Sequence, residues 1–174
     1  MPNIVPEKGI NFSVYLEGAD CLGVAEGNFP NLEAMTSEVK GAGIAGTVDS
    51  IVLGHFNSTT VTLKWRNTTD HFAKLAAHRT FDLDLYAAHQ DYDAGLGLYV
   101  VRQIHVYLKG TPKHSNIGDL IVGDGSNTET ELEVSYLKLE IDGKERVEMD
   151  KFNYIYKVDG VDYLAGVRSA LGKQ

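Results

Sequence analysis

The sequence predicts a mostly-β fold, a β-sandwich or barrel with one short central helix and a C-terminal helix. Short runs rich in Val, Ile, Thr, Tyr and Phe alternate apolar with polar residues, as strands with one buried face do. Eighteen glycines break the chain between these runs. The 174 residues are 43% hydrophobic and 23% charged, which is enough apolar material for one core. No linker-like composition divides the chain, so we expect a single domain over residues 1–174.

The strand predicted at 58–66 has the most regular alternation. Thr59, Val61, Leu63 and Trp65 point to one side, and the polar residues between them point to the other. This period of two predicts a strand with one buried face and one solvent face. Three further strands are predicted in the same way, at Phe12/Val14/Leu16, Phe81/Leu83/Leu85 and Val100/Ile104/Val106/Leu108.

The longest predicted strand, 129–141, changes its pattern half way. Leu132, Val134 and Tyr136 share one parity, whereas the apolar residues that begin at Leu137 share the other. A change of parity within one strand indicates either a β-bulge or burial on both faces. The second alternative would follow if a partner subunit covered the outer face.

Two segments have the pattern of helices. Thr69 and Asp70 are favoured residues at a helix N-terminus and predict a short helix that ends near His78. The second helix is predicted from about Val161 to Leu171, where apolar residues recur at three- and four-residue spacing and a glycine follows. Between the two, residues 110–127 are rich in turn residues and predict a long loop with one short strand at 120–122.

Three glycines in six residues predict the tip of a long hairpin. Gly41, Gly43 and Gly46 lie between predicted strands at 32–40 and 47–53. Glycine permits positive φ and a close approach of another backbone. Ile44 lies among these glycines as an apolar side chain with no local partner, where an intermolecular contact would bury it. The alternative is a floppy hairpin tip without a partner, and Ile44 favours a tip that contacts another molecule.

Composition excludes several classes of protein. Sixteen Lys and Arg against twenty-four Asp and Glu give a formal charge of −8, which is the wrong sign for a protein that grips nucleic acid through its phosphates. A single cysteine, Cys21, permits no internal disulfide and no cysteine-based metal site. The start of the chain has no signal-peptide pattern, and no run reaches the ~20 apolar residues of a membrane span. We therefore expect a chain without a membrane anchor.

No catalytic, cofactor or metal site is predicted. The six histidines lack metal-ligand spacing, and Cys21 has no basic neighbour in the sequence that would activate its thiol. The run from His89 to Gly95 is better explained by a hairpin turn than by a calcium loop. Asp82 and Asp84 share a strand face, but nothing around them indicates a glycosidase cleft. We therefore expect a protein that is not an enzyme.

Several segments at the two ends of the chain together follow a family pattern. They are Asn11-Phe12-Ser-Val14-Tyr-Leu16-Glu-Gly18, Leu22-Gly23-Val24-Ala25, Gly41-Ala42-Gly43-Ile44-Ala45-Gly46-Thr47-Val48-Asp49, Tyr136-Leu-Lys-Leu-Glu-Ile-Asp142-Gly143-Lys144-Glu145, Val147-Glu148-Met149-Asp150, Asn153-Tyr154-Ile155 and Val158-Asp159-Gly160-Val161-Asp162. These segments resemble the major tail tube proteins of contractile-tailed, P2-type bacteriophages. The middle of the chain, from about 67 to 127, carries no such resemblance.

The resemblance implies a structural subunit of a virion tail, with the tail-tube fold. Subunits of this family form hexameric rings that stack into a tube inside a contractile sheath, and DNA passes through the channel on ejection without specific binding. The implied partners are other copies of the chain, the sheath protein, the baseplate and the tape measure protein, and assembly takes place in the host bacterial cytoplasm. A long hairpin reaches the neighbouring ring, and this role is carried onto Gly41, Ala42, Gly43, Ile44, Gly46 and Asp49.

Two sets of carboxylates are candidates for the channel wall of such a tube. An acidic or neutral wall lets DNA slide, whereas a lysine-lined wall would hold it. Asp82 and Asp84 are the favoured set, and the row of Glu129, Glu131 and Glu133 is the alternative.

Two other functions stay open from the sequence. The same subunit type builds rings of tail-like bacteriocins and secretion systems, which the residues do not distinguish from a phage tail. A soluble carbohydrate-binding β-sandwich is the third hypothesis, because nine tyrosines could supply an aromatic platform. This hypothesis predicts a stable monomer, whereas a phage tail tube or a tail-like particle predicts rings or tubes.

Overall fold

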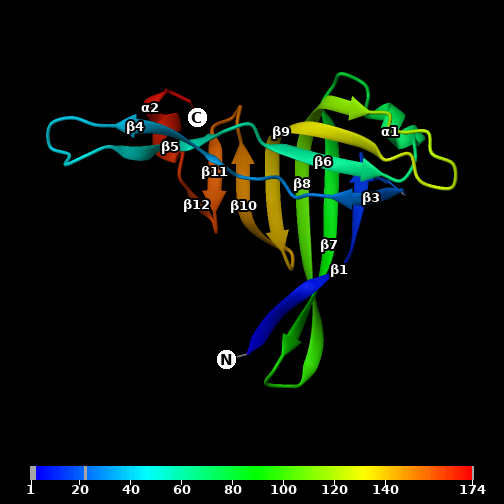
Figure 1. Cartoon of the computed structure of the whole chain (residues 1–174). Coiled ribbons are helices and arrows are strands. Elements are labelled where there is room, and N and C mark those ends of the chain that lie inside the picture. The colour runs from blue at the N-terminus through cyan, green and yellow to red at the C-terminus, as the bar shows by residue number, and fades with distance from the viewer. Residues whose placement is uncertain (1–2, 22, 174) are drawn as a thin grey trace.

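The computed structural model describes residues 3–21 and 23–173 and consists mainly of antiparallel strands, with two short helices in those ranges (Figure 1). The mostly-β prediction is confirmed. Leu22, the first residue of one of the segments that carry the family resemblance, lies outside the described residues. The elements are β1 (Ile4–Leu16), β2 (Ala19–Asp20), β3 (Val24–Gly27), β4 (Ala34–Val39), β5 (Val48–Phe56), β6 (Thr60–Trp65), α1 (Asp70–Lys74), β7 (Phe81–Asp93), β8 (Leu98–Asn116), β9 (Thr128–Ile141), β10 (Lys144–Asp150), β11 (Ile155–Val158), β12 (Val161–Asp162) and α2 (Ala165–Ala170).

One large sheet makes up the body of the subunit. Its strands follow the order β12-β11-β10-β9-β8-β7-β1-β2, and β6 pairs with the first half of β9 and with β3. Strand β9 therefore belongs to two layers. Its first half runs with β6 across the top of β7 and β8, and its second half continues the main layer beside β8 and β10 (Figure 1).

The core lies between these two layers. Val61, Leu63 and Trp65 of β6 belong to the same buried cluster as Leu83 of β7 and Leu108 of β8. The Trp65 indole N–H donates to the Thr130 hydroxyl at 3.3 Å, so the only polar atom of this side chain is satisfied inside the core. The prediction of a half-buried strand at 58–66 is confirmed.

A β-bulge explains the change of parity in β9. Tyr136 pairs with Lys109 and Val134 pairs with Gly110, so that Ser135 is an extra residue with no partner on β8. The extra residue turns the following side chains over, because successive residues of a strand point to opposite faces. Leu132 and Val134 are buried before the bulge and Leu137 after it. The bulge alternative of the sequence analysis is thus confirmed.

Helix α1 begins as predicted but ends early. The Thr69 hydroxyl accepts the Phe72 backbone N–H at 3.3 Å, which is the geometry of an N-cap. The helix ends at Lys74, not near His78 as predicted. Buried Phe72 packs edge-on against Trp65, and this contact holds the short helix at one end of the core.

The C-terminal helix is shorter than predicted, because its expected first turn is a strand. Val161 and Asp162 pair with Val158 and Lys157, and α2 begins only at Ala165. The backbone groups of Val161 and Asp162 are paired with β11, and this strand pairing overrides the helix propensity of the segment. The loop predicted at 110–127 begins only at residue 117. Strand β8 continues to Asn116, and residues 120–122 are not a strand.

A basic pair fixes α1 to the turn after β1. The Lys74 ammonium and the Arg79 guanidinium both lie 2.6 Å from the Glu17 carboxylate. The bonds from Arg79 and then Lys74 lower the pKa of Glu17 to about 2.

We expect a pH signature of this pair in thermal unfolding. A carboxylate whose pKa is lowered on folding stabilises the protein above its ordinary pKa, and the contribution disappears as the pH falls toward 2. Glu17→Gln should therefore lower the melting temperature at pH 7 and make no difference near pH 2. Melting curves of both proteins between pH 7 and pH 2 test this. A constant difference over the whole range would contradict the prediction.

Candidate functional site

The predicted hairpin is present and its tip is exposed. Strands β4 and β5 form a two-stranded sheet of their own that projects from the body (Figure 1). Gly41, Gly43 and Gly46 have φ of +138°, +93° and +135° in the connecting turn, which residues with a side chain rarely adopt. Ala42 lies between the first two, and Ile44 keeps 40% of its surface exposed.

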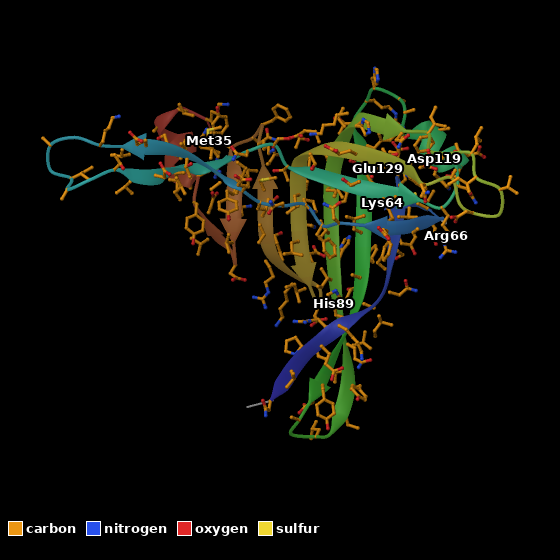
Figure 2. All side chains as sticks on the ribbon, viewed as in Figure 1. Met35, Lys64, Arg66, His89, Asp119 and Glu129 are labelled. Carbon is orange, nitrogen blue, oxygen red and sulfur yellow. The ribbon has the colours of Figure 1, made fainter. Side chains whose placement is uncertain are left out.

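The flanks of the hairpin are apolar as well. Exposed apolar side chains line both strands of the hairpin. Figure 2 shows one of them, Met35, on β4. Glu38 and Asp49 face each other across the two strands, and Lys40 pairs with Glu38 at 2.8 Å. The exposed apolar residues of the hairpin are Met35, Val39, Ile44, Val48, Ile51 and Leu53.

A second projection was missed by the sequence analysis. It consists of residues 4–10 of β1, 89–93 of β7 and 98–101 of β8 with the turn between β7 and β8, and is called the arm below (Figure 1). Figure 2 shows His89 where the arm leaves the body. Leu96, Leu98, Tyr99 and Val101 are each more than half exposed. No single segment of the sequence indicates the arm, because the lengths of β7 and β8, 13 and 19 residues, follow from the pairing of these strands in the fold.

Buried carboxylates stabilise the arm and its turn. Asp91 is 4% exposed and lies 3.1 Å from the Arg102 guanidinium. Asp93 accepts the backbone N–H groups of Gly95 and Leu96 at 2.9 and 3.1 Å. The acidic run at 89–95 thus has a structural role in the hairpin that joins β7 to β8, as the sequence predicted, although its first five residues are strand and not turn.

Strand β1 has an open edge. Its neighbours are β7 on one side and β2 on the other, and β2 pairs only with Tyr15 and Leu16. In the described part of the chain, residues 4–14 therefore have no strand on the β2 side. The Phe12 N–H bonds to the Asn11 side chain at 2.9 Å. At the opposite end of the sheet, β12 covers only Lys157 and Val158 of β11. Open edges of this length are templates for pairing with another chain.

Asp82 and Asp84 lie on the solvent face of the main layer, but they differ in environment. Asp82 is exposed, whereas Asp84 is half-buried and lies 2.6 Å from Nε2 of His105. Nδ1 of His105 lies 3.2 Å from the Glu140 carboxylate, and the ring stacks on Tyr86 with 4.2 Å between centroids. Asp84 is therefore part of a bonded cluster that joins β7, β8 and β9.

Ion pairs continue across the same face, which is called the sheet face below. Lys138 bonds to Glu140 at 2.9 Å and, with His105, lowers the pKa of that carboxyl. Tyr136 donates to Glu148, and burial together with this bond raises the tyrosine pKa well above its ordinary range. Lys157 pairs with Glu148 at 2.8 Å. Acidic and basic side chains thus neutralise one another over much of the sheet face.

The alternative glutamate row lies on the other layer. Glu129, Glu131 and Glu133 are on the half of β9 that pairs with β6, and Figure 2 shows Glu129 beside Lys64 there. Glu131 and Glu133 both pair with Lys113, at 2.9 and 3.4 Å. The two candidate sets do not line a common surface.

The remaining candidates have structural roles. Cys21 is buried, and burial raises its thiol pKa to about 11, which makes it a poor nucleophile. Residues 3–21 and 23–173 contain no group of three or more His, Cys, Asp or Glu side chains arranged to hold a metal ion. Over the same residues, no helix has the length and apolar character that crossing a membrane requires.

Projecting hairpins and open sheet edges are features through which a subunit can pair with other chains. The family model of phage tail tube protein FII matches residues 6–172, and the chain belongs to this family. It is a structural protein of a phage tail tube. A relative described as the tail tube protein of Escherichia phage P2 is 28% identical over 175 residues, which cover 97% of this chain and 98% of that protein. The resemblance inferred from the two ends of the sequence is confirmed over nearly the whole chain.

Proposed function

We propose that this chain is the repeating subunit of an inner tail tube, in which hexameric rings stack and enclose a channel that conducts DNA on ejection. The observation that carries the proposal is the open edge of β1, at the opposite end of the main sheet from β11 and β12. Two different free edges on one subunit are what a head-to-tail ring needs, because each copy offers one edge to each neighbour. The role is structural, and we propose no enzymatic activity.

Ring formation in this scheme joins the main layers of neighbouring copies. The edge of β1 in one copy pairs with the β11–β12 edge of the next, and the sheets then form one continuous wall. Pairing satisfies backbone groups that are otherwise exposed to water. The hairpin tip, with Gly41, Ala42, Gly43, Ile44, Gly46 and Asp49, lies outside this wall and contacts the adjacent ring.

The sheet face becomes the channel wall in this arrangement. Asp82 and Asp84 lie on it, which favours them over the glutamate row for this role. The ion pairs of the sheet face leave few free cations to hold DNA phosphates. DNA would pass such a wall without being bound.

Reversing one exposed charge on the proposed wall should slow DNA passage. Asp82→Lys places a cation where the exposed carboxylate stood, and each added cation strengthens phosphate binding. We expect tubes of normal shape and slower DNA ejection, measured by the release of labelled DNA from purified particles. Glu129→Lys is the matched control on the other layer and should leave ejection unchanged. Normal ejection by Asp82→Lys particles would remove Asp82 from the wall.

The proposed partners are other copies of the chain, the sheath protein, the baseplate and the tape measure protein, and we propose that assembly takes place in the host bacterial cytoplasm. Negative-stain electron microscopy of the purified protein tests self-assembly directly. Rings or tubes are the expected result. A stable monomer with sugar affinity would favour a carbohydrate-binding module instead. Particles of the tail type without a packaged genome would indicate a bacteriocin or secretion device built from the same subunit.

A further inference from the structure

Leu164 is buried apart from the main core. It is 2% exposed, yet it is not part of the cluster that fills the space between the two layers. Its side chain lies against the backbone of Gly54 in β5. A Cβ atom added at Gly54 would come within 2.4–2.6 Å of three side-chain carbons of Leu164, which is closer than such atoms approach. Leu164 therefore occupies a notch that exists only because residue 54 is glycine.

The notch lies where the hairpin changes direction. Ala34 pairs with Phe56 and Thr36 pairs with Ile51, so one residue of β4 (35) is opposite four residues of β5 (52–55). Gly54 is one of these four and has a φ of +66°. A bulge bends the strand that contains it. The direction in which residues 36–51 project is therefore set at this point.

Aromatic contacts support the same junction. Phe56 packs edge-on against Tyr156 with 4.8 Å between ring centroids, and His55 approaches Tyr154 at 6.4 Å. Lys151 also donates to the Asn57 carbonyl oxygen at 3.1 Å. The base of the hairpin thus rests on the C-terminal segment, where Leu164 at the start of α2 lies against Gly54 of β5.

Arg168 holds this C-terminal segment together. Its guanidinium donates to the Tyr154 carbonyl oxygen at 2.7 Å and to the Asp162 carboxylate at 2.6 Å. The other carboxylate oxygen of Asp162 accepts the Leu164 backbone N–H at 3.0 Å. Arg168 lowers the pKa of Asp162, as expected for a carboxylate that it bonds. Arg168 therefore fixes Tyr154 by a direct hydrogen bond. It fixes Leu164 indirectly, through Asp162.

We propose that Leu164 and Arg168 are positioning residues for the β4–β5 hairpin, and that the C-terminal segment acts as a latch that holds the hairpin in the direction needed for assembly. Leu164 fills the notch at the bend, and Arg168 keeps Leu164 in place. The claim that the hairpin direction is needed for assembly rests on the proposed function, because it takes the hairpin as an assembly contact. The claim that Leu164 and Arg168 position the hairpin concerns the isolated subunit and is tested without assembly.

Complementary substitutions in the notch test whether Leu164 positions the hairpin. The measurement is hydrogen exchange of the unassembled subunit. Gly54→Ala drives a methyl group into Leu164, and we expect the hydrogen-bonded amides within the paired segments 36–39 and 48–51 to exchange at least tenfold faster while the core strands β7–β9 keep their protection. Leu164→Ala alone removes the side chain that fills the notch and should also make the same amides exchange faster. In the double variant the methyl group at 54 occupies the space that Leu164 left, so hairpin exchange should be slower than the product of the two single effects. Strictly multiplicative effects would overturn the latch.

Arg168→Gln is compared with Arg146→Gln, which breaks a similar ion pair that does not touch the hairpin junction. Arg146 bonds Asp159 at 2.8 Å and is more exposed than Arg168. We expect faster hairpin exchange in Arg168→Gln only, with both proteins folded by far-UV circular dichroism. Equal exchange in the two variants would overturn the role of Arg168. If the hairpin of Arg168→Gln loosens and tubes still form, the positioning role stands and the hairpin is not the assembly contact of the proposed function.

Discussion

A subunit that carries Ile44→Asp is expected to fold normally and to form no tubes at concentrations at which the unchanged protein polymerises. Ile44 is 40% exposed at a tip whose glycines allow close approach of another chain. Burying the exposed part of Ile44 contributes about 1 kcal/mol, and an unpaired carboxylate at the same contact adds a desolvation cost of about 1–3 kcal/mol. Because each 1.4 kcal/mol is a factor of ten, the critical concentration should rise by roughly 100-fold.

The measurement is tube mass by pelleting and electron microscopy over a concentration series. Ile44→Val is the matched control, because it keeps an apolar β-branched side chain at the tip and should polymerise. Melting curves of the unassembled subunits should agree, since Ile44 contributes no contact to the buried core. Unchanged tubes from Ile44→Asp would eliminate the tip as an assembly contact.

The second large effect is expected from Phe12→Pro on the open edge of β1. In residues 3–21 and 23–173, the Phe12 N–H bonds to the side chain of the adjacent Asn11 and to no other strand. Proline is tolerated at an edge strand when the missing N–H points away from the sheet, but it cannot donate to an incoming strand. We expect the subunit to fold and ring closure to fail, with monomers in sedimentation velocity where the unchanged protein forms rings.

Phe12→Val controls for loss of the aromatic ring. Both variants shorten the side chain, and only proline removes the N–H. Rings from Phe12→Val with none from Phe12→Pro would identify strand addition as the closing interaction. If both variants form rings, the edge of β1 is not the contact between copies.

The elements predicted most accurately are those that local sequence determines. The strand at 58–66, the bulge in β9 and the glycine-rich hairpin tip each follow from residues close together in the chain. The start of α2 was wrong because Val161 and Asp162 pair with residues of β11, and pairing of this kind overrides helix propensity.

The arm and the contacts of Asp84 could not be predicted from single segments. The arm requires knowledge of where the body ends, which depends on how β6 and β9 cover the other strands. His105 meets Asp84 and Glu140 only after β7, β8 and β9 align in register. Sequence spacing placed Asp82 and Asp84 on one face correctly, but it did not indicate that only Asp82 remains exposed.

The irregularity of the β1 edge has a consequence for the timing of polymerisation. Pro6 lacks an N–H, Lys8 carries a charge, and the register with β7 shifts twice between Pro6 and Asn11. Such features hinder casual pairing between free edges. Two colliding subunits therefore meet a nucleation barrier, whereas a preformed ring binds incoming subunits through the hairpin contact and so holds their β1 and β11–β12 edges in alignment. Free subunits should therefore accumulate without aggregating. Polymerisation should show a lag phase, and added seeds should abolish that lag and start rapid tube growth.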